Sequence, residues 1–544
     1  MISANLRVPQ PLNEPVKSYA PGAPERAELK AALSRLTAER PEIAVRIEGK
    51  ELRTGKLDAI RAPHRHAQVL GTFHEAGPLE TSAAITAALA AKRSWSTMAF
   101  TDRAAIFLRA AELLATKYRP LLNAATMLGQ SKTSHQAEID AACEAIDFLR
   151  FNVHFAQTLL DQQPSSSPGV WNQTDYRPLD GFVFAVAPFN FTAIALNLCT
   201  APALMGNVVL LKPAQSAMLS GHWIMELLRE AGLPEGVITM LPGPGPVISD
   251  VVLNHADLGG IHFTGSTRTF NLLWRTVGEK IDRYRQYPRL VGETGGKDFI
   301  FVHPSAADDL DAVATAIVRG GFEFQGQKCS ACSRVFVPQS LWPRLQERLV
   351  PMIEGLRMGD VTDFRNFMGA VIDERSFVNA SKYLELAKGP DATVLAGGTG
   401  DRSEGWFIRP TLVQCATPTH RLMTEEIFAP IVSLFVYPDA EYVETLKACD
   451  RAAPYALTGA VFARDRAAIV TASAELRHAA GNFYVNDKPT GAVVGQQPFG
   501  GSRGSGTNDK AGSMLNLVRW TSPRTIKETF VPPTSVGYPF MSAE

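Results

Sequence analysis

Residues 182–211, FVFAVAPFNFTAIALNLCTAPALMGNVVLL, decide the fold of this chain. The two ends of the stretch are rich in β-prone residues, whereas its middle is rich in Ala and Leu. An uncharged run of this length also resembles a membrane-spanning helix. However, Pro188, Asn190, Pro202 and Gly206 interrupt it, and they favour a strand, a turn, a buried helix and a second strand over a membrane span.

The same alternation continues toward the C-terminus. Between residues 182 and 292, apolar runs typical of strands (FVFAVA, NVVLLK, VITML, GIHF and PRLV) are separated by helical stretches. This pattern predicts a doubly wound parallel sheet, an architecture that binds nucleotides at its strand ends. A second alternation runs from DFIFV past RVFVP, IVSLFVY and TGAVFA to about residue 486, and it predicts a second α/β domain.

The remaining segments have simpler patterns. Apolar residues at helical spacing predict an amphipathic helix over 24–40, and EIAVRIEGKEL after it predicts a hairpin or edge strand. Alanine-rich helices are expected over roughly 81–160. Residues 161–181, rich in Pro, Ser and Gly, predict a loop or a protruding ribbon. The Pro-interrupted C-terminal tail contains too few core residues to fold alone, so we expect it to lie on another surface.

Length and composition narrow the classes of partner and the compartment that are expected. A chain of 544 residues is long enough for two or three domains. Its formal net charge is zero, so neither nucleic acid nor a membrane is expected as the main partner, and a small-molecule ligand is more natural. Six scattered cysteines favour a reducing compartment. The first residues lack the features of an export or import signal, so we expect a cytoplasmic protein, or a mitochondrial matrix protein in a processed form.

The glycine fingerprint of dinucleotide-binding folds is missing. The best phosphate-binding candidate is HFTGSTRTF, 262–270, which places Gly265, Ser266 and Thr267 between a strand and a helix. Backbone N–H groups at a helix N-terminus bind pyrophosphate, although a Ser that simply caps the helix has the same pattern. Lys212 ends the strand NVVLLK, at the edge of a parallel sheet where ligands bind.

Three separated residues suggest covalent chemistry at a carbonyl group. Asn190 lies in a predicted turn between a strand and a helix, Glu293 precedes two glycines, and Cys329 opens the C-x-x-C pair with Cys332. A thiolate nucleophile, an amide donor and a carboxylate base are the parts that such a reaction needs. A redox couple or a zinc pair is disfavoured, because no second C-x-x-C or nearby pair of histidines supplies further ligands.

The order of these motifs is informative. PFN, LKP, FTGS, ETGGK, GQKC, EEIF and PFGG follow one another between residues 188 and 501, and this series resembles the aldehyde dehydrogenase superfamily. Within it, FNFTAI, QAEIDAA, GQKCSACSR, GNFYVNDK, VVGQQPFGG and SGTNDK resemble the L-glutamate γ-semialdehyde dehydrogenases, also called 1-pyrroline-5-carboxylate dehydrogenases. The resemblance implies an N-terminal helix and hairpin region (1–60), a Rossmann-type NAD-binding domain (61–160 and 182–292), a small β oligomerisation flap with a tail (161–181 and 510–544) and an α/β catalytic domain (293–509).

The resemblance also implies an activity, which is the NAD-dependent oxidation of L-glutamate γ-semialdehyde to L-glutamate in proline catabolism. Cys329 is expected to attack the aldehyde, forming a thiohemiacetal and then a thioester. The Asn190 amide and the Cys329 backbone N–H are expected to hold the oxyanion, and Glu293 to activate water. No metal is implied.

Further site residues follow from the same resemblance. For NAD, it implies Lys212 at the adenosine ribose, Gly265, Ser266 and Thr267 at the pyrophosphate, and Glu426 at the nicotinamide ribose, with Phe428 packing beside it. Gln215 stands where relatives often have an acidic residue that repels a 2′-phosphate, which weakens the expected exclusion of NADP.

For the substrate, Ser330 and the Gly491-Ala492 loop are expected to bind the carboxylate, and Phe191 and Phe499 to flank the aliphatic chain. The family loop usually has Ser where this chain has Ala492, so we expect weaker carboxylate binding and the same reaction class.

Two other functions remain open from the sequence: another semialdehyde dehydrogenase, for example one that acts on succinate semialdehyde, and a catalytically silent structural relative. A homo-oligomer, at least a dimer, is expected from the 161–181 ribbon and the tail, because an apolar ribbon on a monomer would be exposed. A separate proline dehydrogenase is a further candidate for transient contact.

Overall fold

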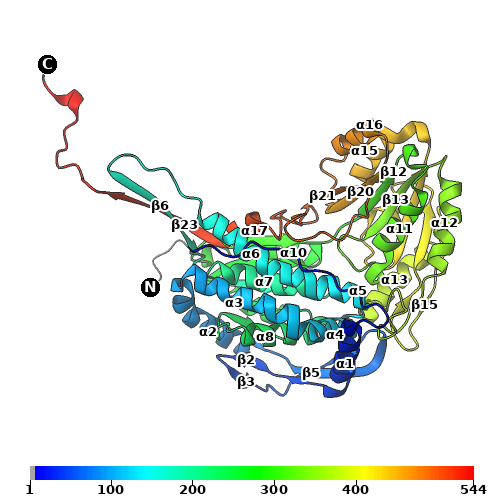
Figure 1. Cartoon of the computed structure of the whole chain (residues 1–544), viewed down its shortest axis with the longest axis horizontal. Coiled ribbons are helices and arrows are strands. Elements are labelled where there is room, and N and C mark those ends of the chain that lie inside the picture. Colours follow the sequence, from blue (N-terminus) through cyan, green and yellow to red (C-terminus); the bar gives the residue numbers. More distant parts are fainter. Residues whose placement is uncertain (1–5) are drawn as a thin grey trace.

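The computed structural model describes residues 6–544, which contain two large β-sheets with helices on their faces (Figure 1). The first sheet is parallel and has the strand order β11-β10-β7-β8-β9. This is the doubly wound order, in which the chain reverses direction across the sheet between β7 and β10. The predicted α/β fold is confirmed. The strands are β7 (Phe182–Val186), β8 (Val209–Lys212), β9 (Ile238–Met240), β10 (Leu258–Thr264) and β11 (Arg289–Glu293).

Both faces of this sheet are buried, which explains why β7 is a continuous apolar run. Val183 and Ala185 point into one core, and Phe182 and Phe184 point into the other, because successive side chains of a strand alternate. The helices on the first face are α3 (Phe100–Leu113), α4 (Arg119–Gln130), α6 (Ala145–Leu160), α7 (Thr192–Leu204) and α8 (Met218–Glu230). The helices on the second face are α2 (Pro78–Thr97), α9 (Gly245–Leu253) and α10 (Thr267–Glu279).

The predicted alanine-rich helices are confirmed, but two segments among them are wider than α-helices. Leu114–Tyr118 and Glu138–Glu144 are π-helical, and the second, η2, joins α5 (Ser134–Ala137) to α6. Such π segments are rare and often mark functional sites.

The N-terminal segment begins with an extended arm and continues into α1 (Pro24–Glu39), which confirms the helix predicted over 24–40. The predicted hairpin is also confirmed, as β2 pairs antiparallel with β3. The short strands that follow α1 are β1 (Glu42–Ile43), β2 (Val45–Ile47), β3 (Lys50–Leu52), β4 (Leu57–Ala62) and β5 (Arg65–His74).

The second large sheet has seven strands in the order β14-β17-β18-β13-β12-β20-β21, and only the β14 pairing is antiparallel among the described residues. Its strands are β12 (Asp298–Val302), β13 (Cys332–Pro338), β14 (Ala392–Ala396), β17 (Thr411–Cys415), β18 (Ile431–Tyr437), β20 (Thr458–Phe462) and β21 (Asn482–Val485). Its main helices are α11 (Leu310–Phe322), α12 (Trp342–Glu354), α13 (Glu374–Leu386), α15 (Tyr442–Ala452) and α16 (Arg466–Glu475). The predicted second α/β unit is confirmed.

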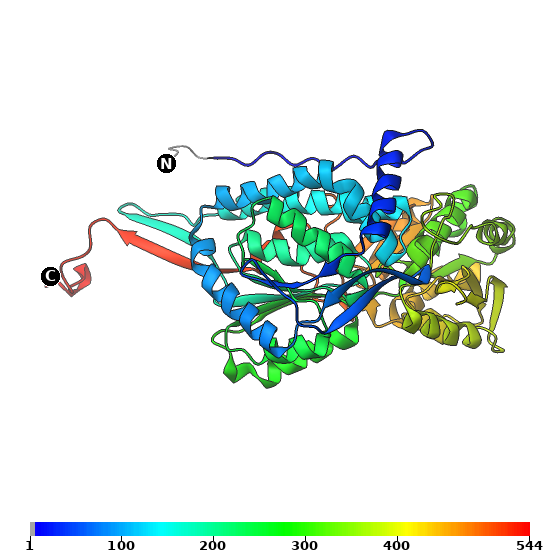
Figure 2. The same cartoon turned by 90° about the horizontal axis from the view of Figure 1, so that it is seen from below.

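A two-stranded ribbon extends away from both sheets, and the C-terminal tail continues beyond it (Figures 1 and 2). It consists of β6 (Val170–Pro178) and β23 (Thr521–Thr529), paired antiparallel over nine residues each. The ribbon predicted within 161–181 is therefore present, and its partner strand comes from the C-terminal segment.

Candidate active site

Asn190, Glu293 and Cys329 meet where the carboxyl ends of the five-stranded sheet face the seven-stranded one. Asn190 lies in the turn between β7 and α7, Glu293 is the last residue of β11, and Cys329 lies in the loop before β13. The Cys329 thiol donates to Glu293 Oε1 across 3.6 Å. Asn190 Nδ2 donates to the carbonyl of Gln327, 3.0 Å away. An amide NH2 has two donor hydrogens, so the second one remains for a ligand.

The loop that carries Cys329 has an unusual backbone. Phe324, Gln325 and Gly326 have φ angles of 51°, 57° and 64°, in the left-handed region that side-chain-bearing residues rarely adopt. Gln325 holds this turn, since its Nε2 donates to the carbonyls of Ser131 and Ala370, at 3.0 and 2.7 Å. Its Oε1 accepts from a third backbone group, the N–H of Gly369 at 3.0 Å. The side chain therefore ties the nucleophile loop to the end of α4 and to the 369–370 loop.

Burial sets the protonation states at the centre. It raises the pKa of Glu293 to about 7, while the Cys329 hydrogen bond and the Lys510 ammonium act in the opposite direction. Burial, reinforced by the Glu293 carboxylate, also raises the pKa of the Cys329 thiol well above its usual range. Cys329 is therefore a neutral thiol at rest, and Glu293 is a base that is half ionised near neutral pH.

A cavity of about 890 Å³ opens on one side of Cys329. Its size lies within the range of small-molecule sites. Of the residues predicted to bind NAD, Gly265, Ser266, Glu426 and Phe428 line it, together with Asn190 and Cys329. Lys212 and Thr267, both within the described residues, lie outside its lining. Lys212 ends β8 as predicted, and burial lowers its pKa to about 8.

The residues around this cavity fit a dinucleotide. Ser266 caps α10 by accepting from the N–H of Thr269, so both interpretations of this motif apply: it is a helix cap, and it lies at a helix N-terminus that faces a cavity. Glu426 accepts from the N–H of Gly296 at 3.0 Å, and a Cβ on Gly295 would lie only 2.1 Å from its Oε1. The two glycines after Glu293 therefore let the Glu426 carboxylate approach.

A second, narrower cavity of about 130 Å³ opens on the other side of Cys329. All five residues predicted to bind the substrate line it, although they come from four separate segments: Phe191, Ser330, Gly491, Ala492 and Phe499. Ser330 Oγ and Thr490 Oγ1 lie 2.8 Å apart, which links the nucleophile loop to the 490–497 loop. Cys329 lines both cavities.

The sequence did not predict the charged residues of this second cavity. His135, Glu144, Arg319, Glu323 and Lys488 also line it. Burial raises the pKa of Glu144 well above its usual range. These residues come from α5, η2, α11 and two further segments that are far apart in the sequence, so only the fold reveals that they share a cavity.

Gln215 lies in an acidic environment. Gln215 Nε2 lies 3.5 Å from Asp58 Oδ2 and 3.5 Å from Glu75 Oε1. Two carboxylates thus lie beside this neutral side chain. They would repel an anionic group at this position.

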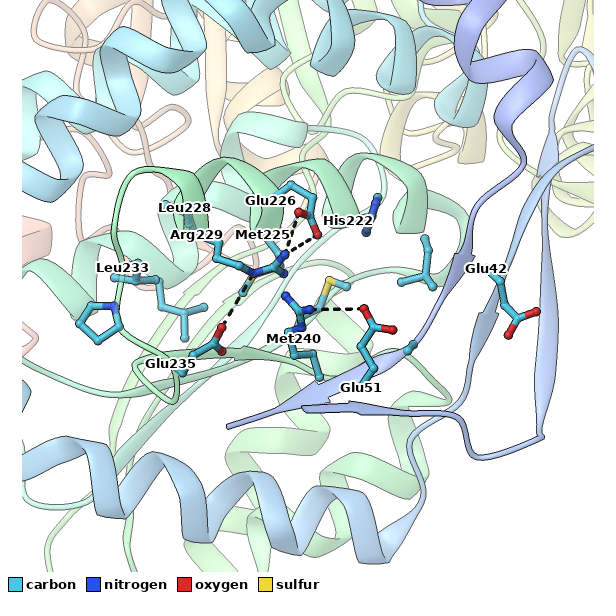
Figure 3. Close-up of a pocket in the computed structure, with 15 residues that line it drawn as sticks. Glu42, Glu51, His222, Met225, Glu226, Leu228, Arg229, Leu233, Glu235 and Met240 are labelled. Atoms are coloured by element: carbon cyan, nitrogen blue, oxygen red, sulfur yellow. Dashed lines mark hydrogen bonds and ion pairs between the residues drawn. The ribbon is translucent and has the colours of Figure 1, made fainter. Parts of the chain in front are cut away.

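A further cavity of about 90 Å³ lies far from Cys329 in the sequence, between the β2–β3 hairpin and α8 (Figure 3). Two ion pairs lie among its charged side chains: Arg229 Nη1 lies 2.7 Å from Glu226 Oε2, and Arg46 Nη2 lies 3.3 Å from Glu51 Oε1. Elsewhere in residues 6–544, no cluster of three or more His, Cys, Asp or Glu side chains has the geometry of a metal site. No helix in the same range is long and apolar enough to cross a membrane.

Comparisons with known proteins agree with this geometry. A model of the aldehyde dehydrogenase family matches residues 53–526. The delta-1-pyrroline-5-carboxylate dehydrogenase of Dictyostelium discoideum, a mitochondrial protein, is 51% identical over 542 residues, which cover 99% of this chain and 97% of the relative. The human mitochondrial enzyme of the same name is 48% identical, over 97% and 94% of the two chains.

A solved structure is equally similar. The delta-pyrroline-5-carboxylate dehydrogenase from Mycobacterium tuberculosis, crystallised with NAD, superposes with a TM-score of 0.96 at 53% identity and covers the whole of both chains. The family model and these full-length relatives together show that the chain belongs to the aldehyde dehydrogenase family.

Proposed function

We propose that the protein catalyses the NAD-dependent oxidation of L-glutamate γ-semialdehyde, which is in equilibrium with 1-pyrroline-5-carboxylate, to L-glutamate. The observation that carries this proposal is the position of Cys329, which lines both the larger and the narrower cavity. A thiol at this junction reaches an aldehyde in one cavity and faces a cofactor in the other. The full-length similarity to pyrroline-carboxylate dehydrogenases supports the choice of substrate.

The first step is the activation of the thiol. Glu293 Oε1 is the acceptor of the Cys329 thiol hydrogen, and its pKa of about 7 suits a base that works near neutral pH. Transfer of this proton leaves a thiolate, which is the reactive form of cysteine. Sγ then bonds to the aldehyde carbon, and the carbonyl electron pair moves onto oxygen as a thiohemiacetal oxyanion.

Asn190 stabilises that oxyanion. Its Nδ2 is held by the Gln327 carbonyl, two residues before the nucleophile, so the remaining N–H is oriented before the substrate arrives. The backbone N–H of Cys329 is the second donor. A preorganised donor of this kind contributes about 3–4 kcal/mol to the transition state.

NAD, when bound in the larger cavity, supplies the hydride acceptor for the oxidation. We assign the nicotinamide ribose to Glu426, with Phe428 beside it, and the pyrophosphate to Gly265, Ser266 and Thr267. Lys212 is assigned to the adenosine ribose. Asp58 and Glu75, beside Gln215, disfavour the extra phosphate of NADP.

Glu293 acts a second time once the acyl group is attached to Cys329 as a thioester. It first loses to solvent the proton that it took from Cys329. The carboxylate then takes a proton from water, the water oxygen bonds to the acyl carbon, and the bond to Sγ breaks to release glutamate. The thiolate is thereby regenerated.

The narrower cavity selects the amino acid head of the substrate. Ser330 and the Gly491-Ala492 loop, which line it, donate to its α-carboxylate, and Phe191 and Phe499 pack against its methylene groups. Succinate semialdehyde lacks the amino group and is one carbon shorter. It would therefore reach poorly from Cys329 to the Gly491-Ala492 loop.

We also propose that the protein is at least a dimer. The ribbon and tail expose large apolar side chains, including Trp171 (52% exposed), Phe530 (59%) and Phe540 (84%). An isolated two-stranded ribbon is marginally stable in water, so a second copy of the chain is the expected cover. Light scattering on the purified protein should give at least twice the chain mass of 59.0 kDa, and a mass of one chain would contradict the proposal.

The test of the activity is NADH formation by purified protein with 1-pyrroline-5-carboxylate, run beside succinate semialdehyde and beside NADP in place of NAD. We expect strong activity only with pyrroline-carboxylate and NAD, and none in Cys329→Ala. Preference for succinate semialdehyde would reassign the substrate. Activity with neither aldehyde would favour a catalytically silent relative.

A further inference from the structure

The N-terminal arm, residues 6–19, lies outside the part of the chain that matches the aldehyde dehydrogenase family model, which begins at residue 53. The arm has no regular secondary structure, yet it runs along the continuous helical segment formed by η2 and α6 (Figure 2). The arm and this segment run in opposite directions, so later residues of the arm contact earlier residues of the helix. Val8 N–H donates to Gln157, Glu14 N–H to Asp147, and Lys17 N–H to Glu138. The arm is therefore bound along its length.

One residue of the arm reaches beyond the helix. Asn13 Nδ2 donates to Asp147 Oδ2 on α6 and to the carbonyl of Val494, each at 2.8 Å. Asn13 Oδ1 accepts from Gln496 Nε2 at 2.9 Å. The amide thus uses both of its donors and its acceptor to bridge α6 and the 490–497 loop.

The 490–497 loop is the wall of the narrower cavity that includes Gly491 and Ala492. Gly491 has a φ of 96° and Gly495 one of 83°, so the loop contains two turns that only glycine adopts without strain. A Cβ on Gly495 would lie 2.2 Å from the Phe151 ring of α6, so the loop packs directly on that helix. Ordering a loop that contains two glycines costs much backbone conformational entropy, so the loop depends on such contacts to hold one conformation.

The arm also contacts a second segment that lines the same cavity. Glu138, fully buried in η2, accepts from the N–H of Lys17 at 2.8 Å and from the hydroxyl of Tyr19 at 2.7 Å, and it pairs with Arg119. The same π-helical turn carries Asp140 and Glu144, and both line the cavity. The N-terminal arm therefore contacts two segments that line the narrower cavity, the 490–497 loop and η2.

We infer that the N-terminal arm is a specificity element of the active site, in which Asn13 is a positioning residue that fixes the 490–497 loop for the α-carboxylate of the substrate. This inference rests on the proposed function, because it assigns the loop to the amino acid head. Asn13 touches neither the reacting carbon nor Cys329. Its removal should therefore weaken binding of substrates that carry the head and leave the chemistry at Cys329 intact.

The test compares two substrates and two variants, one in the arm and one on α6 where the arm is bound. 1-Pyrroline-5-carboxylate carries the carboxylate head, whereas propanal presents only an aldehyde and a short chain to Cys329. Asn13→Ala removes the bridge to the loop. Gln157→Ala is the matched control, because it removes the hydrogen bonds of Gln157 to Val8 N–H and the Leu6 carbonyl without touching the loop.

We expect Asn13→Ala to raise the KM for pyrroline-carboxylate about tenfold with kcat nearly unchanged, as the loss of one positioning interaction predicts. The kcat/KM for propanal should stay within about twofold of the wild type, and Gln157→Ala should stay within that range for both substrates. Equal effects of the two variants, or an equal loss with both aldehydes, would overturn the inference, since either would indicate a purely structural role.

A second variant covers the case in which Asn13→Ala does not fold. Gln496 is exposed, so Gln496→Ala removes only the outer half of the bridge, and the KM for pyrroline-carboxylate alone should rise, by about threefold. An unchanged KM would overturn the inference. Failure of the proposed function is recognised separately, because the wild-type protein would then form no NADH with pyrroline-carboxylate.

Discussion

The pH dependence of the reaction follows from the burial of Glu293. With a pKa of about 7, this carboxyl group is half protonated at neutral pH, whereas an exposed glutamate would be fully ionised. Only the carboxylate accepts a proton from Cys329. The ionised fraction is about one tenth at pH 6, so kcat/KM should be about tenfold lower there than on its alkaline plateau, and should fall tenfold per unit below that.

The assay uses propanal at pH 5.5–9, because pyrroline-carboxylate titrates and hydrates on its own in this range. NAD is kept saturating, because burial raises the pKa of Glu426 to about 7 as well, and its titration would otherwise enter through cofactor binding. In Glu293→Gln the rate should fall by roughly 10²- to 10⁴-fold and lose the inflection near pH 7. A wild-type profile that is flat between pH 5.5 and 8, as an ordinary exposed glutamate would give, would contradict this origin of the pH dependence.

Lys510 provides a further check that Glu293 is the group that titrates in this profile. Its ammonium lowers the pKa of Glu293, so Lys510→Met should move the inflection upward. A downward movement would mean that another group titrates. Because Lys510 also donates to the carbonyls of Gly481 and Gly500, thermal unfolding must first show that the variant is folded.

Three more predictions address the rest of the site. Asn190→Ala should lower kcat by roughly 10²- to 10³-fold while Cys329 still reacts with iodoacetamide; loss of that labelling would mean that Asn190 holds the loop rather than the oxyanion. Ala492→Ser should lower the KM for pyrroline-carboxylate about threefold and leave that for propanal unchanged; an unchanged KM for both would make the hydroxyl irrelevant. Gln325→Leu leaves three buried backbone groups without their partner, so chemical denaturation should show that the free energy of unfolding falls by about 3 kcal/mol or more. An unaltered midpoint would mean that Gln325 does not hold the Cys329 loop.

The sequence predicted the sheets because their strands are buried on both faces. β7 and β8 are short apolar runs, and Pro188 and Asn190 separate the first from its helix, so strand, turn and helix are each marked in the chain. The motif series likewise pointed to Cys329, Glu293 and Asn190. The structure places these residues together, and their chemical roles remain predictions, as do the domain boundaries.

Other features depend on contacts between distant segments and leave no local pattern. The π-helical register of Glu138–Glu144 is stabilised by the arm on one side and by α7 on the other, where Asp140 accepts from the N–H groups of Thr192 and Ala193. The arm itself is bound through side chains of α6 rather than through a β-ladder, so it has neither helical nor strand periodicity. The raised pKa of Glu293 is a consequence of burial, which a sequence does not state.

The most direct test of the central claim is to find the acyl group on Cys329. Wild-type protein and Glu293→Gln are mixed with 1-pyrroline-5-carboxylate and NAD, quenched in acid within one turnover, digested, and analysed by mass spectrometry. We expect a γ-glutamyl thioester on the peptide that contains Cys329, dependent on NAD and absent in Cys329→Ala. In Glu293→Gln it should be slower to form and slower to hydrolyse, because Glu293 acts in both steps. An adduct on Cys332, or NADH formation without any adduct on Cys329, would contradict this mechanism.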